Sequence, residues 1–186
     1  KKASKKSSKK ASKSKKSSKL DIIKESDQVK YLESKVIDDL KILSEKYDLG
    51  QYFFTKKILI VGDKNRIPHS HPVLTMTARY LINKDYKLEH LLANFIHEQY
   101  HWFQQEHLDE FEKIRSILIK KFPDLNDGSG REKNSYDHVI VCFLEVKAMK
   151  KLVGDGIVSN MYNVKNLRFY QEIYSTVTEN FEEINK

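Results

Sequence analysis

The chain has 186 residues, which is long enough for one domain with a core and too short for two of ordinary size. Of these residues, 39% are hydrophobic and 32% are charged. No apolar run reaches the ~18 residues of a transmembrane helix, so we expect no segment to span a bilayer. The single cysteine, Cys142, excludes a disulfide within the chain and a cysteine-rich structural zinc site. The chain begins with Lys, which fits a cleaved secretory signal and a shortened chain equally well and leaves the compartment open.

Residues 1–19 form a separate, strongly basic segment. They comprise ten Lys, seven Ser and two Ala, and we expect them to be a disordered tail. The formal net charge of +8 therefore becomes −2 for residues 20–186, which argues against a folded surface that binds nucleic acid. The tail itself could contact a polyanion, either nucleic acid or an anionic membrane, and a plain solubilising spacer fits its composition equally well.

The first half of the predicted domain combines a helix with strands. Apolar residues at three-and-four spacing between Val29 and Tyr47 predict an amphipathic helix that stops before Gly50. Residues 51–63 and 72–80 are rich in β-branched and aromatic residues, which predicts two strands.

The second half is predicted to be helical. A helix is expected over residues 86–107, bending or restarting into a segment that ends at Pro123, and a loop over 123–135. A further helix is expected over 136–152, and a last apolar stripe runs from Leu167 to Phe181. This order predicts one α+β domain over residues 20–186, with a small sheet packed against several helices.

The sequence His97-Glu98-Gln99-Tyr100-His101 lies within the central predicted helix and forms an HExxH motif. Imidazoles four residues apart share a helix face, about 5–6 Å apart at Cβ, so both can reach one zinc ion at about 2.0 Å. Glu98 can then face a water on the metal. In helical projection, the apolar residues between Leu88 and Phe103 lie on the opposite side from the two imidazoles, which leaves the imidazoles free to line a site.

The chain resembles the zincin metallopeptidases over the predicted strand at 72–80, the helix with HEQYH and a later helix. The resemblance implies a zincin-like fold, a zinc ion on His97 and His101, and Glu98 as general base. It also implies that an upstream edge strand pairs with an extended peptide, so that the partner is a peptide or protein substrate.

A catalytic zinc needs a third protein ligand, and the first candidate is Glu145. Glu145 lies in the middle of an apolar helical stripe, where a carboxylate is rarely buried without a partner, and the lysines of that helix lie on other faces. The arrangement resembles the gluzincins, in which a glutamate on a second helix completes the site. We therefore favour Glu145 as the third ligand.

Other histidines and tyrosines give alternatives. His107 follows His97 at the spacing of the metzincin motif, but Gln104 replaces the glycine that turns the chain there, and a continuous helix would carry His107 out of reach. His138 could be a second-shell or oxyanion group, or an ordinary core histidine. Tyr170 and Tyr174 could donate to the transition state, although both fit the packing stripe better.

These features predict a zinc-dependent hydrolase, most specifically a metallopeptidase in which Glu98 takes a proton from a zinc-activated water and passes it to the leaving amine. The alternative is a non-catalytic, zincin-like metal-binding or interaction module that the basic tail tethers to a polyanion. A di-iron helical bundle needs a second ExxH pair, which the chain lacks.

Overall fold

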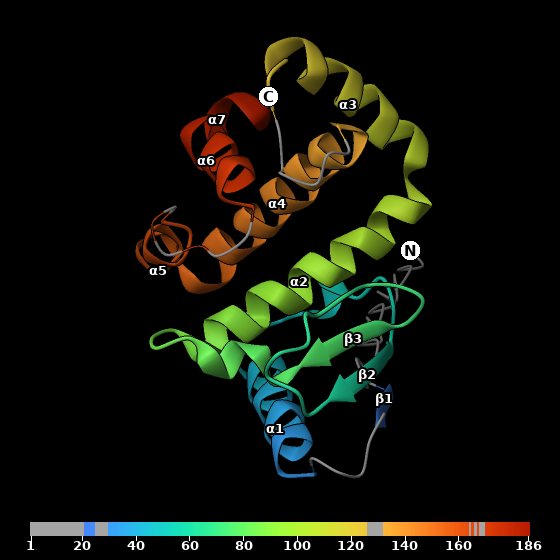
Figure 1. Cartoon of the computed structure of the whole chain (residues 1–186), viewed down its shortest axis with the longest axis vertical. Helices are drawn as coiled ribbons and strands as arrows, with labels where there is room; N and C mark the ends of the chain where they lie inside the picture. Colours follow the sequence, from blue (N-terminus) through green and yellow to red (C-terminus); the bar gives the residue numbers. More distant parts are fainter. Residues whose placement is uncertain (1–20, 25–29, 126–131, 164, 166, 168–169) are drawn as a thin grey trace, which may run out of the picture.

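The computed structural model describes residues 21–24, 30–125, 132–163, 165, 167 and 170–186. The predicted tail over residues 1–19 and the middle of the predicted loop, 126–131, lie outside these ranges. Within them, the chain is mostly helical with a small parallel sheet, and the expected α+β class is confirmed (Figure 1).

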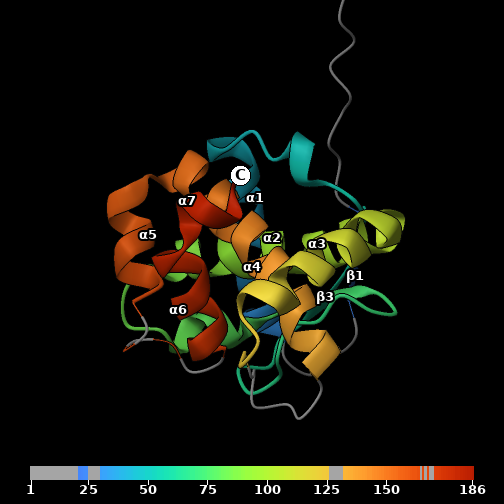
Figure 2. The same ribbon diagram turned by 90° about the horizontal axis from the view of Figure 1, so that it is seen from above.

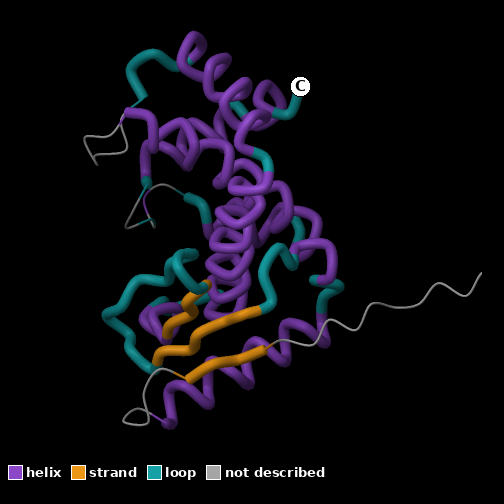
Figure 3. The backbone as a smooth tube through the Cα atoms, turned by 90° about the vertical axis from the view of Figure 1, so that its right-hand side faces the viewer, coloured by secondary structure: helices purple, strands orange, loops and turns teal. Residues whose placement is uncertain are grey.

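The sheet has three parallel strands in the order β1 (Asp21–Lys24), β2 (Lys57–Val61) and β3 (Leu74–Thr77), which Figure 3 shows side by side in orange. Ile58 is in register with Leu74, and Ile60 with Met76. Because residues two apart on a strand share a face, these four fully buried side chains form one apolar surface.

Two helices pack against the strands, α1 (Lys30–Lys46) and α2 (Lys87–Glu106). Val36, Leu40 and Leu43 of α1 join the hydrophobic core with the sheet, and the predicted first helix is confirmed. The predicted strands were too long, because their ends form the 3₁₀ helices η1 (Gly50–Tyr52) and η2 (Ala78–Ile82). The Thr77 hydroxyl starts η2 by accepting a hydrogen bond from the backbone N–H of Arg79, which ends the extended run. Strand β1 was not predicted.

Strand β3 has a neighbour on both sides. One neighbour is β2. On the edge of β3 that faces away from β2, His69 forms an antiparallel bridge with Thr75 through two backbone hydrogen bonds of 2.7 and 3.2 Å. The Thr77 hydroxyl also donates to the carbonyl of Arg66. The segment before β3 therefore folds back over the end of the sheet.

The second half of the chain builds a helical layer around α4 (Glu132–Val153), which packs lengthwise on α2. Seen from above in Figure 2, α2 and α4 lie at the centre, with α3 (Leu108–Lys121) on one side and α5 (Asp155–Met161), α6 (Gln171–Glu179) and α7 (Phe181–Ile184) on the other. Arg115 fastens α3 to α4 by a two-pronged ion pair with Asp137 of 2.6 and 3.0 Å.

The predicted helices at 86–107 and 136–152 are confirmed, and the predicted restart is confirmed at His107, where α2 ends and α3 begins. Helix α5 was missed, and α6 begins at Gln171 rather than near Leu167. Among the described helices, none combines the length and the apolar character that crossing a membrane requires.

The side chain of Gln99 connects α2 to the segment between η1 and β2. Its side chain is completely buried, and its Oε1 accepts hydrogen bonds from the backbone N–H groups of Phe54 and Thr55, at 2.8 and 2.9 Å. Its Nε2 donates to the carbonyl of Thr55 at 2.8 Å. One side chain thereby satisfies three backbone groups of the segment between η1 and β2.

We predict that Gln99→Leu lowers the free energy of unfolding by about 2–4 kcal/mol, because it keeps the bulk but leaves three partly buried backbone groups without this partner. Urea denaturation at neutral pH measures this loss. The matched control is Gln105→Leu, on the exposed side of the same helix, which we expect to change stability by no more than about 0.5 kcal/mol. Equal effects at the two positions would contradict the role given to Gln99.

Candidate metal centre

Three imidazoles meet between α2 and α4. His97 and His101 come from one face of α2, as their spacing predicts, and His138 comes from the facing side of α4. The ring centroids lie 4.9 Å apart for His97 and His101, 5.1 Å for His101 and His138, and 6.0 Å for His97 and His138. One ring nitrogen from each lies within 4.8 Å of the other two. The structure thus forms a triangle of potential metal ligands.

The spacing of two of these nitrogens suits a tetrahedral ion. Nε2 of His97 lies 3.3 Å from Nε2 of His101. Two nitrogens bound to tetrahedral zinc at 2.0–2.1 Å stand about 3.3 Å apart, so this pair fits zinc with little change. The residues present therefore match the group that the HExxH motif implies.

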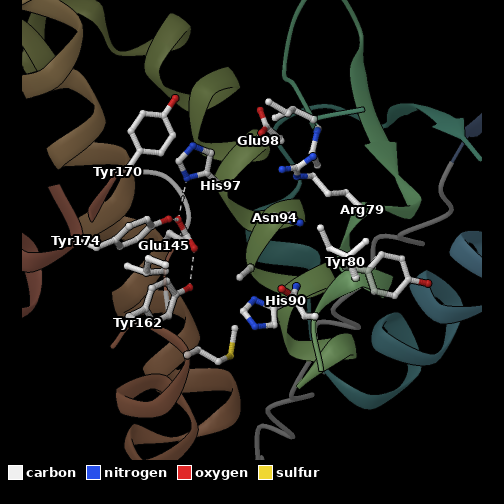
Figure 4. A pocket seen from close by; sticks show the side chains of 17 residues that line it. Arg79, Tyr80, His90, Asn94, His97, Glu98, Glu145, Tyr162, Tyr170 and Tyr174 are labelled. Atoms are coloured by element: carbon white, nitrogen blue, oxygen red, sulfur yellow. Dashed lines mark hydrogen bonds and ion pairs between the residues drawn. The ribbon is translucent and has the colours of Figure 1, made fainter. Parts of the chain in front are cut away.

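Behind the triangle, Glu145 is held in a buried hydrogen-bond network. Glu145 is only 2% exposed, and its Oε2 lies 2.8 Å from Nδ1 of His97. The hydroxyls of Tyr162 and Tyr174 donate to its two oxygens, each at 2.6 Å (Figure 4). An ionised carboxylate only accepts hydrogen bonds, so Nδ1 of His97 carries the proton and its Nε2 faces His101.

The surroundings shift the pKa values of His97, His101 and Glu98 in different directions. Burial opposes a charge on His97, but its interactions with Cys142 and Glu145 outweigh burial and raise its pKa. Burial lowers the pKa of His101 to about 3, helped by the neighbouring His97 and His138, so His101 is neutral at pH 7. Burial also raises the pKa of Glu98 to about 7, partly offset by His97.

Glu98 lies beside His97 at a pocket with a volume of about 230 Å³. Figure 4 shows both on α2: His97 lies toward the side chains of Tyr170 and Tyr174 from the second half of the chain, and Glu98 lies on the side of Arg79. Tyr170 adopts the left-handed backbone conformation (φ 54°) just before α6, and its ring stacks on His138 at 4.7 Å. His97, Glu98 and Tyr170 therefore line one cavity, whereas His101 and His138 are not among its lining residues.

The sequence candidates fall into two groups. His97, Glu98, His101, His138 and Glu145 are brought together, whereas His107 ends α2 and packs edge-on against Phe103 at 4.0 Å, outside both ligand groups found among the described residues.

Some residues of the centre were missed. Cys142, fully buried, forms a second group of potential ligands with His97 and Glu145. Tyr162 was not singled out, and Tyr174 was assigned to packing, although it also donates to Glu145. The spacing of Cys142 to Glu145 on one helix face was a usable signal, whereas Tyr162 directly follows α5, a helix that was not predicted.

The zincin resemblance implies that an edge strand pairs with the substrate, but backbone groups at the free edge of β3 are already hydrogen-bonded. A substrate strand that added to β3 would need the N–H and C=O of Thr75, and both are already bonded to His69. Pairing along β3 therefore requires that the segment around His69 move aside.

Comparisons of the chain with protein-family models, with curated proteins and with solved structures found no match.

We predict that Tyr162→Phe and Tyr174→Phe each lower the free energy of unfolding by about 1–3 kcal/mol, because each change removes a donor from a buried carboxylate. Urea denaturation of the metal-free protein at pH 7 measures both. Tyr31→Phe is the control, since Tyr31 is 78% exposed and should tolerate the change within about 0.5 kcal/mol. Losses at positions 162 and 174 no larger than at position 31 would show that Glu145 does not depend on these hydroxyls.

Proposed function

We propose that this chain is a zinc-dependent hydrolase of the zincin metallopeptidase type, with His97, His101 and His138 as zinc ligands and Glu98 as general base. The observation that carries the proposal is the 3.3 Å separation of the two Nε2 atoms, with a third imidazole in reach and a buried carboxylate behind His97. Histidine ligands supported in this way by a carboxylate are characteristic of zinc sites.

His138, rather than Glu145, is proposed as the third ligand. Glu145 bonds Nδ1 of His97, which is the opposite ring nitrogen from the one that faces His101, and its oxygens already accept hydrogen bonds from two tyrosines. The sequence-based assignment of Glu145 to the metal remains the alternative. It would require Glu145 to give up these contacts.

In this proposal Glu98, Glu145 and Tyr170 have separate roles beside the zinc ion. A bound zinc ion would contribute a water whose pKa falls toward about 7 and a positive charge near the scissile carbonyl. Glu98 accepts the proton of the attacking water and delivers it to the leaving amine. Glu145 keeps His97 in one tautomer, and Tyr170 borders the pocket where its hydroxyl can meet the substrate.

The ligand assignment predicts a ranking of zinc affinity. His138→Ala should lose zinc as fully as His97→Ala, whereas Glu145→Gln should bind zinc about 10–100-fold more weakly, the usual effect of changing a group that orients a ligand. Competition with a chromophoric chelator, together with metal analysis by mass spectrometry, measures the affinities.

His107→Ala is the control, because His107 lies apart from the centre and should leave zinc affinity unchanged. Complete loss of zinc in Glu145→Gln with retention in His138→Ala would reverse the assignment. Absence of zinc binding by the wild-type chain would refute the metal site altogether.

The role of Glu98 gives a separate prediction. Glu98→Gln should keep zinc and lower the rate of peptide hydrolysis by about 10²–10⁴-fold, because the amide cannot accept the proton. Mass spectrometry of a mixed peptide library incubated with zinc-loaded protein measures cleavage. Glu106→Gln, an exposed glutamate at the end of the same helix, is the matched control and should retain the wild-type rate.

A zinc-loaded wild-type protein that cleaves no peptide in the library would instead support the non-catalytic metal-binding alternative. Undiminished cleavage by Glu98→Gln would remove Glu98 from the chemistry and leave the zinc assignment intact.

A further inference from the structure

The pocket beside the candidate metal centre continues along α2, away from that centre. Its lining includes Glu98, Asn94 and His90, which follow one another at intervals of four residues and therefore share a helix face. Figure 4 shows these three side chains in this order along the helix. At 1.5 Å per residue, Asn94 lies about 6 Å and His90 about 12 Å from Glu98 along the axis. The pocket thus has a second region, one to two turns of α2 away from the proposed general base.

This second region offers hydrogen bonds without charge. Asn94 and Asn83 contribute carboxamides to the lining, and His90 contributes an imidazole. Burial lowers the pKa of His90 below its ordinary value of 6.5, so its ring is neutral at pH 7. A carboxamide and a neutral imidazole each donate as well as accept hydrogen bonds. The region is therefore complementary to a ligand group that also does both.

The carboxamide of Asn94 is available to a ligand. The side chain is half-buried, and none of the described residues forms a hydrogen bond with it. Figure 4 shows it in the middle of the pocket, between Glu98 and His90. Met161 and Leu167 supply apolar wall to the same pocket. A ligand can therefore hydrogen-bond Asn94 while its hydrocarbon portion contacts an apolar surface.

We propose that Asn94 forms a carboxamide-binding subsite, so that the preferred substrates carry a glutamine or asparagine side chain next to the bond presented at the metal centre. The axial distance of about 6 Å from Glu98 is close to the reach of such a side chain, which makes the residue concerned an immediate neighbour of that bond. This inference rests on the proposed function and specifies its substrate class.

The chemistry of the subsite distinguishes a carboxamide from side chains of similar size. Two carboxamides pair through two N–H···O bonds, in which each supplies one donor and one acceptor. An ionised carboxylate has no proton to donate, an ammonium has no lone pair with which to accept, and an aliphatic group has neither. Each of these would leave polar groups of the subsite unpaired, which costs binding free energy.

A binding experiment tests the subsite without relying on turnover. Four hydroxamates are titrated into zinc-loaded protein by calorimetry. Acetohydroxamate addresses the metal alone, and the other three have chains of equal length that end in an amide, an acid or a hydrocarbon: the monohydroxamates of succinamic and succinic acid, and 4-methylpentanohydroxamate. We expect the amide to bind wild type at least about tenfold more tightly than the acid and the hydrocarbon, since only the amide satisfies both hydrogen bonds.

The variants assign this gain to one side chain. Asn94→Ala removes the carboxamide without adding bulk, Asn94→Leu keeps its bulk, and both should abolish the preference for the amide. Ala and Leu are strong helix formers, so α2 should be retained. Gln105→Leu removes an exposed carboxamide from the same helix and should keep the full preference. Acetohydroxamate should bind all of these variants alike, which also reports that the metal centre is intact.

The outcomes separate the two proposals. If acetohydroxamate fails to bind wild type, the metal centre fails and the subsite with it. If acetohydroxamate binds but the amide shows no advantage over the acid and the hydrocarbon, or keeps its advantage in both Asn94 variants, the subsite alone is overturned.

Cleavage of matched peptides by wild type and Asn94→Leu decides which side chain supplies the carboxamide. Faster cleavage of a peptide with Gln beside the scissile bond than of its Met counterpart indicates glutamine. Faster cleavage of a peptide with Asn there than of its Leu counterpart indicates asparagine. Either preference should disappear in Asn94→Leu, and equal rates for both pairs with wild type would refute the proposal.

Discussion

The buried carboxylate of Glu145 is the constraint around which the helical half of the molecule is organised. A carboxylate that is 2% exposed is costly unless donors surround it, and here the donors come from three separate parts of the chain. His97 lies on α2, Tyr162 follows α5, and Tyr174 lies on α6. The hydrogen bonds of one side chain of α4 therefore define where three neighbours pack. They also fix the ring of His97, so the same interaction that assembles this layer orients the candidate metal ligand.

Helix α2 serves the fold and the site at once because successive residues point about 100° apart. Its apolar side chains, such as Leu92 and Ile96, enter the core, while His97 and His101 face α4. Gln99 holds the segment before β2. The residues of the HEQYH motif thus contact different neighbours, and Gln99 contributes to stability while the two imidazoles remain available to a metal ion.

Periodicity sufficed to predict the long helices and the pair of imidazoles on α2, because both depend on spacing within one element. The third ligand could not be chosen in this way. His138 and Glu145 are seven residues apart, which is two helical turns, so they share a face and the pattern favours neither. Glu145 was favoured because a buried carboxylate needs a partner and its own helix offers no suitably placed lysine. The partners that the structure provides are tyrosines from other elements, Tyr162 and Tyr174, which no local pattern connects to Glu145.

Long and short elements contribute different parts of the candidate site. The imidazoles and Glu98 project from α2 and α4, whose extensive packing holds their relative positions. The facing wall of the pocket comes from η2 and from the segment before β3, where Arg79 and Ile67 lie. Short segments of this kind can change sequence and length without disturbing a helical pair. The wall that faces the centre can therefore diverge in sequence while the imidazoles keep their positions, since the two are built on different parts of the fold.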